Sequence, residues 1–153
     1  MERMFQEANR LVCRWDGETL IVEPWGENGL RVRSAMLREP EDTDYALLPQ
    51  ERAEAVITVG EERSEIRNGK IIGVMEKGKN SGAVLSFYNS EGKLLLAEAG
   101  EDGALNRRSR FFKPVIGGDY QLAVTFASDP EEKLYGMGQY QQDFLNIKYC
   151  NLE

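Results

Sequence analysis

The sequence LVCRWDGETLIV at residues 11–22 is the strongest indication of the fold. Two apolar, β-branched runs flank Asp16-Gly17, and a dipeptide of this kind favours a two-residue hairpin turn because its glycine takes the positive φ that a type I′ turn demands. We therefore predict a β-hairpin here. The same pattern recurs along the rest of the chain.

Three further turn signals separate short apolar runs, and they lie at residues 68–69 (Asn-Gly), 89–92 (Asn-Ser-Glu-Gly) and 117–119 (Gly-Gly-Asp). Residues 30–37 alternate strictly, which predicts a strand with Arg31 and Arg33 on a face in contact with water. Residues 38–44 are charged and are interpreted as an exposed connection. Only residues 49–55, which begin with proline, suggest a helical turn or two.

About ten to twelve short strands with hardly a helix predict an all-β fold, an antiparallel sandwich or barrel. A length of 153 residues suits one domain that spans residues 1–153. Direct strand-to-strand connections exclude a doubly wound parallel sheet.

The composition excludes several classes of function. Without any histidine, the chain has no Ser-His or Cys-His dyad. Two cysteines cannot complete a usual zinc site, and Gly136 and Gly138 lack the third glycine and the βαβ unit of a dinucleotide site. We therefore expect neither a metal nor a cofactor. A net charge of −7 argues against nucleic acid and against an anionic membrane as partners.

Targeting signals are not apparent in the sequence. No apolar run approaches the ~20 residues of a membrane-spanning helix. The opening residues, MERMFQEANR, contain no apolar signal region. The cytoplasm is therefore the expected compartment.

The charged residues predict no catalytic residue in this chain. Most acids lie in turns or beside Lys and Arg, and none stands within an apolar run that would raise its pKa, so we expect no catalytic carboxylate pair. The only basic cluster consists of Arg107, Arg108, Arg110 and Lys113. We interpret it as the solvent-exposed face of a hairpin and not as a phosphate groove.

Four residues with specialised side chains are interpreted as packing residues. Cys13 and Cys150 are expected to be reduced, partly buried thiols, although they could be bridged if the chain termini lay on adjacent strands. Trp15 and Trp25 are expected in the core between two sheets, where aromatic residues of strands mostly lie.

The most unusual segment is YGMGQYQQDFLN at residues 135–146, which is dense in glycine, amides and aromatics. Such a neutral, amide-rich surface suits a sugar better than a phosphate, and the candidate substrate-binding residues are Gln139, Tyr140, Gln141 and Asn146. The alternative is a terminal strand that merely pairs with its neighbour. For the glycines Gly136 and Gly138 we expect a close backbone approach or a bulge in a strand.

Residues 132–139, EKLYGMGQ, resemble the E-x-hydrophobic-Y-G-hydrophobic-G-E/Q stretch of glycoside hydrolase family 31, which contains α-glucosidases and α-xylosidases. Tyr135, Gly136 and Gly138 match the structural positions of this motif. The aromatic pair Phe87-Tyr88 and the turn that follows it are also similar to the family. Gln139 stands where many members have Glu, and it is closer to members that resemble α-xylosidases.

The resemblance implies a fold and a role. In this family the N-terminal domain is a β-sandwich of the galactose-mutarotase supersandwich type, and the catalytic aspartates lie in a following (β/α)₈ barrel. No catalytic residue is therefore carried over to this chain. The implied partners are the catalytic barrel of a longer parent chain and an oligosaccharide or glycoside substrate at the domain junction.

Three hypotheses follow from the sequence. The first is the non-catalytic N-terminal domain of an α-glycosidase, which supports the barrel and helps to shape the leaving-sugar end of the active site. The second is a stand-alone carbohydrate-binding sandwich without hydrolase activity. The third is a structural or interaction module without a ligand.

Overall fold

Short antiparallel strands joined by turns make up the computed structural model, which describes residues 3–44, 46–51, 53–79, 81–100, 108–136, 138 and 143–150. The first sheet has the order β1 (Met4–Glu7), β2 (Arg10–Trp15), β3 (Glu18–Pro24) and β4 (Leu30–Met36). The second sheet has the order β5 (Val56–Thr58), β6 (Arg63–Asn68), β7 (Ile71–Glu76), β8 (Val84–Asn89) and β9 (Leu94–Ala97). A separate hairpin consists of β10 (Arg110–Pro114) and β11 (Tyr120–Val124). No helix is present among the described residues, and the predicted all-β antiparallel sandwich is confirmed.

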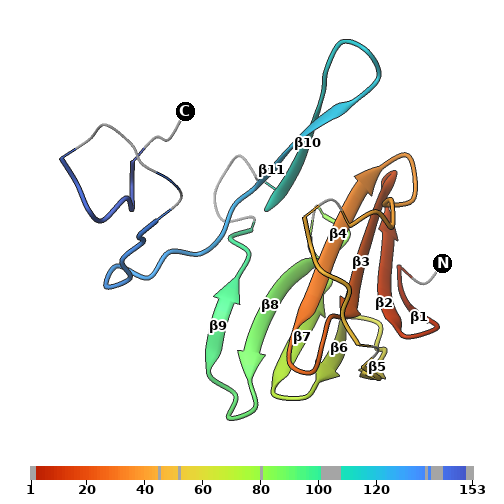
Figure 1. The fold of residues 1–153 in the computed structure, drawn as a ribbon. Coiled ribbons are helices and arrows are strands. Elements are labelled where there is room, and N and C mark those ends of the chain that lie inside the picture. The colour runs from red at the N-terminus through yellow and green to blue at the C-terminus, as the bar shows by residue number, and fades with distance from the viewer. Residues whose placement is uncertain are drawn as a thin grey trace.

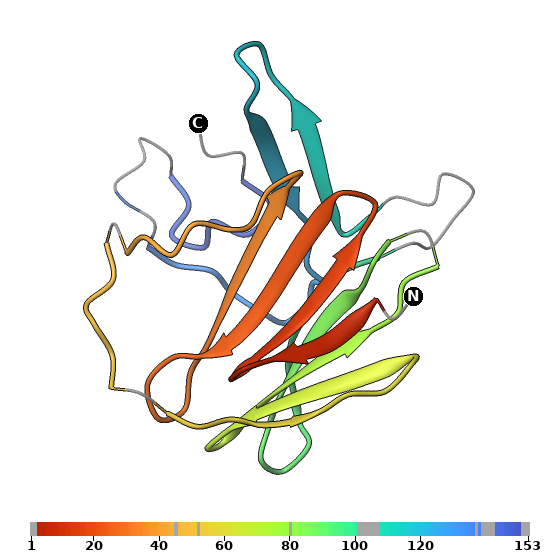
Figure 2. The same cartoon turned by 90° about the vertical axis from the view of Figure 1, so that its right-hand side faces the viewer.

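The two larger sheets face each other across the main core (Figures 1 and 2). Alternate residues of β2 and β3 point inward, and they meet apolar side chains of β6, β7 and β8. The fully buried members of this core include Leu11, Leu20, Ile66 and Met75. The alternation of inward and outward residues along each strand therefore sets which side chains form the core.

The predicted turns are present where the sequence places them. Asp16 and Gly17 adopt φ values of 48° and 82°, so both residues between β2 and β3 have the positive φ of a type I′ turn. Gly69 has a φ of 56° between β6 and β7. The turns at residues 89–92 and 117–119 also join paired strands. The local turn chemistry is thus sufficient to define four hairpins.

The outer face of β4 differs from the prediction. Arg31 and Arg33 do point away from the core, but only 12% of each side chain is exposed. Residues 37–55, which we call the strap, supply acids that pair with both arginines. Ile21, the partner of Arg33 in the β3–β4 register, is buried on the same face. The arginine face is therefore covered and is not in free contact with water.

The predicted helical turn at residues 49–55 is wrong for the residues that the structure describes there. Asn9, in the turn between β1 and β2, donates from Nδ2 to the Ala53 carbonyl at 2.7 Å and accepts from the Ala55 amide at 2.9 Å. These bonds engage the backbone groups of the strap with another element. The segment is therefore held as an extended connection.

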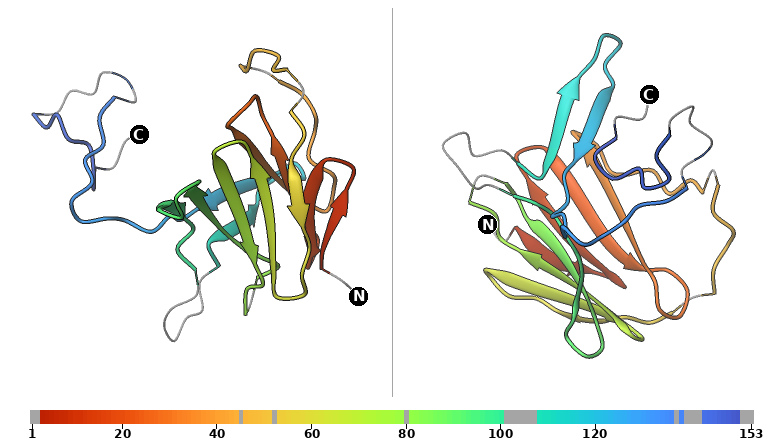
Figure 3. Two further views of the ribbon diagram at one scale, coloured as in Figure 1. Left: turned by 90° about the horizontal axis from the view of Figure 1, so that it is seen from below. Right: turned by 90° about the vertical axis from the view of Figure 1, so that its left-hand side faces the viewer.

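The hairpin β10–β11 is joined to the second sheet beyond the end of β9. Glu98 and Phe126 form an isolated antiparallel bridge. The Ala127 amide donates to the Ala97 carbonyl at 2.8 Å, and the Ala99 amide donates to the Thr125 carbonyl at 2.9 Å. From there the C-terminal segment leaves the sandwich and lies to one side of it (Figure 3).

Candidate functional site

Asn146, a predicted sugar-binding residue, has internal partners in the C-terminal segment. Its Oδ1 accepts hydrogen bonds from the Leu134 amide at 2.9 Å and the Lys148 amide at 3.2 Å. The Ile147 amide donates to the Leu134 carbonyl at 2.8 Å. The amide side chain thus ties the two ends of this segment together. The other three predicted sugar-binding residues, Gln139, Tyr140 and Gln141, lie outside the described residues.

None of the described motif residues lies in a strand. Gly136 and Gly138 have φ values of 92° and 114°, and Tyr135 is exposed. A Cβ on Gly136 would meet nothing within 4 Å, so the expected close backbone approach is wrong at this position. Within residues 135–146, the described residues 135, 136, 138 and 143–146 belong to no strand, so the alternative of a terminal strand is wrong for these residues. Glycine is favoured here because of the positive φ itself.

An apolar cleft of about 500 Å³ opens between the two sheets and the β10–β11 hairpin. Its walls include Leu30 and Val32 of β4, Phe87 of β8, Leu96 of β9 and Val124 of β11. Leu95, Leu96 and Phe126, which also line it, are 54%, 41% and 45% exposed. Clustered apolar side chains at this level of exposure are typical of a surface that another polypeptide covers.

A buried ion pair lies in the lining of this cleft. Only 3% of the side chain of Arg110 and 3% of that of Glu98 are exposed, and Arg110 Nη1 donates to Glu98 Oε1 at 2.5 Å. Arg110 Nε donates to Glu18 Oε1 at 2.6 Å, and its Nη2 donates to the Ala83 carbonyl at 2.6 Å. The interpretation of Arg110 as solvent-exposed is therefore wrong. Burial opposes the charge of Arg110, but Glu98 and Glu18 outweigh it and raise the pKa of the guanidinium.

Glu98 is a buried acid, although the sequence analysis predicted none. Its Oε2 also accepts from the Leu85 amide at 2.9 Å and from Ser109 Oγ at 3.1 Å. The signal was present in the sequence, because Glu98 directly follows the run LLLA at residues 94–97. Because Arg110, the Leu85 amide and Ser109 all bind this carboxylate, Glu98 holds the β10–β11 hairpin against the second sheet and is not free to act as an acid or base.

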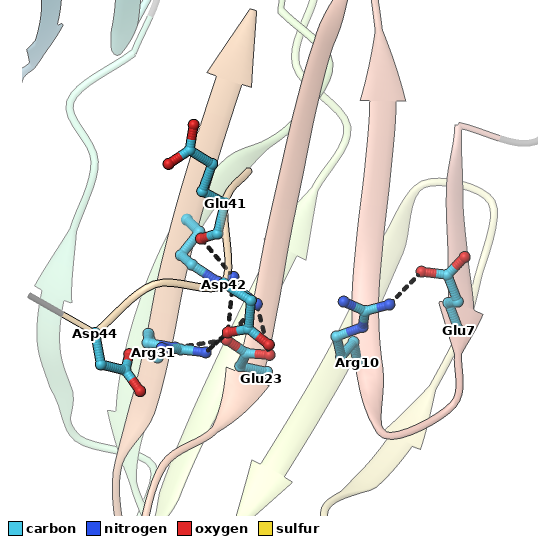
Figure 4. A network of polar contacts seen from close by, with 8 residues as sticks. Glu7, Arg10, Glu23, Arg31, Glu41, Asp42 and Asp44 are labelled. Carbon is cyan, nitrogen blue, oxygen red and sulfur yellow. Dashed lines mark hydrogen bonds and ion pairs between the residues drawn. The ribbon is translucent and has the colours of Figure 1, made fainter. Parts of the chain in front are cut away.

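A second polar cluster, the strap network, lies on the opposite face of β4 (Figure 4). Arg31 Nε donates to Glu23 Oε1 at 2.6 Å, and its Nη2 donates to Asp42 Oδ1 at 2.7 Å. Its Nη1 donates to Asp44. Arg33 Nη1 donates to the Glu41 carbonyl at 2.8 Å. The hydrogen bond from Arg31 holds the pKa of Asp42 below its ordinary value, and the nearby charge of Arg33 adds to this effect.

The tryptophans and cysteines complete the set of predicted residues. Trp15 is half-buried, packs against the core and lies 3.3 Å below the Arg3 guanidinium. Trp25 is half-buried outside the core, with the Arg31 guanidinium 4.0 Å from its ring centroid, so its core assignment is wrong. Cys13 is buried and Cys150 is half-buried, and both are free thiols as predicted.

The part of the chain that the structure describes lacks two features. It contains no group of three or more Cys, Asp or Glu side chains arranged to hold a metal ion. It also contains no helix of the length and apolarity that crossing a membrane requires.

Comparisons with known proteins identify relatives that match all or most of this chain. No established family profile matches it. An uncharacterized family 31 glucosidase of Pseudescherichia vulneris is 40% identical across all of this chain, which spans 31% of that protein. α-Xylosidase A of Aspergillus niger is 30% identical over 86% of this chain, which covers 20% of it.

Solved structures agree with the sequence relatives. The crystal structure of a family 31 α-xylosidase from a soil metagenome, complexed with xylose, matches with a TM-score of 0.81 at 40% identity. That match covers 96% of this chain and 24% of the xylosidase. A xylosidase from Aspergillus niger matches with a TM-score of 0.65 at 23% identity, which supports the fold alone.

The chain spans between a fifth and a third of the length of these relatives. The resemblance that residues 132–139 indicated is confirmed by similarity along the whole chain. The chain therefore corresponds to a part of the α-xylosidases and glucosidases of glycoside hydrolase family 31.

Proposed function

We propose that this domain supports the catalytic (β/α)₈ barrel of a longer α-glycosidase and helps to shape the leaving-sugar end of its active site. The observation that carries the proposal is the 40% identity and the TM-score of 0.81 to an α-xylosidase, over nearly the whole chain. Because that structure is complexed with xylose, an α-xyloside is the first substrate to test.

The apolar cleft adds physical support. Burying apolar surface contributes about 25 cal/mol per Å², so the exposed leucines of β9 favour contact with a further part of the protein. The buried Glu98–Arg110 pair already satisfies the polar groups in the lining, so a covering segment needs to supply only apolar side chains there. In this proposal the sugar-facing residues are Gln139, Tyr140, Gln141 and Asn146.

Hydrolysis of aryl α-xylosides and α-glucosides tests the function. The whole protein is expected to hydrolyse at least one of these substrates, and the 153-residue chain alone is expected to hydrolyse none. Turnover by the rigorously purified chain would contradict the assignment as a non-catalytic domain. Absence of turnover by the whole protein on both substrate classes would contradict the glycosidase assignment.

A substitution in the cleft tests its role in domain support. In the whole protein, Leu96→Asp places a charge where a covering segment would lie, so Tm and kcat are both expected to fall. Ile116→Asp is the matched control, because Ile116 is fully exposed at the β10–β11 turn and does not line the cleft. Equal behaviour of the two variants would argue against a covered cleft.

A further inference from the structure

A second cavity, which we call the strap pocket, has no role in the proposed function so far. It has a volume of about 600 Å³ and lies between the strap and the β1–β2 and β3–β4 connections. Its lining includes Asn9, Trp25, Arg31, Asp44, Gln50 and Glu54. This volume is within the range of about 300–1,000 Å³ that is usual for sites of small ligands.

The wall of the strap pocket is held in place by interactions among its own residues. Asn9 bonds to the strap backbone at Ala53 and Ala55 with both ends of its amide. Arg31 is stacked over Trp25 and bonded to Glu23 and Asp42. A side chain that is fixed before a ligand arrives loses little entropy on binding, so these contacts favour a preformed site.

The charge of the lining restricts the ligand. Among the described residues, five carboxylates and two guanidinium groups contribute to it, and they belong to Glu23, Asp42, Asp44, Glu51, Glu54, Arg10 and Arg31. An anionic ligand would meet this acidic excess and be repelled. A metal ion lacks a suitable ligand cluster in the described part of the chain. The lining therefore disfavours an anion, and its carboxylates can accept hydrogen bonds from the hydroxyl groups of a neutral ligand.

The apolar part of the lining restricts the ligand further. Trp25 supplies an aromatic surface, and Pro24 and Pro49 supply flat aliphatic surfaces beside the carboxylates. A ligand with hydroxyl groups around an apolar ring edge matches both parts, since its hydroxyls donate to carboxylates while its C–H groups contact the rings. A purely apolar ligand would instead match the cleft on the other face of β4.

We propose that the strap pocket binds one sugar ring of a neutral glycoside against Trp25, Asn9 and the strap carboxylates. The choice of sugar as the ligand class is independent of catalysis in the parent protein, and only the choice of an α-xyloside as probe rests on the proposed function. The strap pocket is separate from the cleft, because Leu30 and Val32 point to one side of β4 and Arg31 points to the other. A segment that covers the cleft therefore leaves this pocket open.

The two tryptophans of the chain provide the test and its internal control. Methyl α-xyloside is titrated into the ¹⁵N-labelled full chain, and the two indole N–H signals are followed by NMR. The Trp25 signal and the backbone amides of residues 8–10 are expected to shift with a Kd in the millimolar range. The Trp15 signal is expected to stay in place, because Trp15 packs against the core beneath Arg3.

Variants and other probes separate this site from general surface effects. Trp25→Ala is expected to weaken xyloside binding about tenfold or more, which corresponds to about 1.4 kcal/mol. Tyr120→Ala removes an exposed aromatic ring of the β10–β11 hairpin and is expected to leave binding unchanged. Inorganic phosphate is expected to cause no shift of the Trp25 signal. Trp25→Phe keeps a ring beneath Arg31, and it is expected to retain the fold and part of the affinity.

Three results of the titrations would overturn the proposal. They are equal shifts of both indole signals, shifts confined to the cleft residues Leu96 and Val124, and unchanged affinity in Trp25→Ala. A crystal of the whole protein soaked in methyl α-xyloside is the second measurement, and density for the sugar beside Trp25 is the expected result. An empty strap pocket in that crystal also overturns the proposal. Neither measurement depends on turnover. A protein without glycosidase activity can therefore still show sugar binding in the strap pocket, and an active glycosidase can still lack it.

Discussion

Glu98 follows four apolar residues of β9, and its carboxylate is buried beside Arg110 and Ser109. Removing one partner of such a pair leaves an uncompensated charge in a poorly solvated place, whereas an exposed pair contributes little. Arg108 and Arg110, two positions apart, differ in this way. Arg110 pairs with Glu98 and Glu18 in the interior, whereas Arg108 pairs with Asp16 at the surface. Burial, and not residue type, decides what each arginine contributes.

Arg110→Met is expected to lower the free energy of unfolding by about 3–5 kcal/mol, because Glu98 then keeps only the Leu85 amide and Ser109 Oγ as partners. Arg108→Met is the matched control and is expected to cost less than about 1 kcal/mol. Denaturant unfolding measures both values. The double variant Arg110→Met with Glu98→Gln is expected to recover part of the loss, and simple additivity of the two single changes would contradict the ion-pair account.

Cys13 predicts a loss of stability at alkaline pH. Burial, with a smaller contribution from Glu18, raises the pKa of its thiol from 9.0 to about 11. As the pH rises, the unfolded chain therefore loses this proton before the folded chain does. The contribution of the neutral Cys13 thiol to the free energy of unfolding is complete below pH 9 and is lost as the pH rises toward 11. We expect Cys13 to lower the free energy of unfolding by about 2 kcal/mol over this pH range, and urea unfolding at each pH measures the change. Cys13→Ala should show a shallower decline, and identical pH profiles would refute the assignment.

At the scale of elements, β4 shows how one strand serves two surfaces. Leu30 and Val32 line the apolar cleft, while Arg31 and Arg33 bind the acids of the strap. Strict alternation makes this possible because neighbouring side chains point to opposite faces of a sheet. The strap residues that the structure describes have no regular backbone pairing, so their position depends on these ion pairs and on Asn9.

Asn9→Ala is expected to release the strap, because it removes the bonds to Ala53 and Ala55. The expected cost is about 1–3 kcal/mol in the free energy of unfolding, together with faster proteolytic cleavage between residues 45 and 55. Asn89→Ala is the matched control, since Asn89 Oδ1 accepts only from the Glu91 and Lys93 amides within its own turn. Cleavage of the strap at the same rate in both variants would contradict the role of Asn9.

At the scale of the whole molecule, the sandwich has a closed core and an open cleft. The main core is covered by both sheets, whereas β4 and β9 are edge strands and the apolar residues of β9 remain exposed. Exposed apolar edges favour association with further polypeptide. This uneven burial agrees with a chain that matches less than a third of the length of its relatives.

The isolated chain is expected to bind the dye ANS through this cleft. Val124→Asp should reduce the ANS fluorescence by about half or more, because it introduces a charge among the apolar lining residues. Ile116→Asp, at the hairpin tip outside the cleft, should leave the fluorescence unchanged. Equal dye binding by the two variants would show that the cleft is not the site of binding.

The sequence by itself determined the hairpins, because the positive φ of Gly17 and Gly69 is a local requirement that glycine meets without neighbours. It also determined the family, through residues 132–139 and the resemblance they carry. Alternation along β4 correctly separated Leu30 and Val32 from Arg31 and Arg33, although it did not predict what would cover the arginines.

Only the tertiary structure decided which charged residues are buried and which cavities form. Arg110 is buried because Glu18, 92 residues away, and Glu98, 12 residues away, converge on it when the hairpin meets the two sheets. Trp25 lies outside the core, where Arg31 stacks on its indole ring and is itself paired with the strap acids Asp42 and Asp44. Turn geometry depends on neighbours in the chain, whereas burial depends on which distant surfaces meet, and no local pattern encodes that meeting.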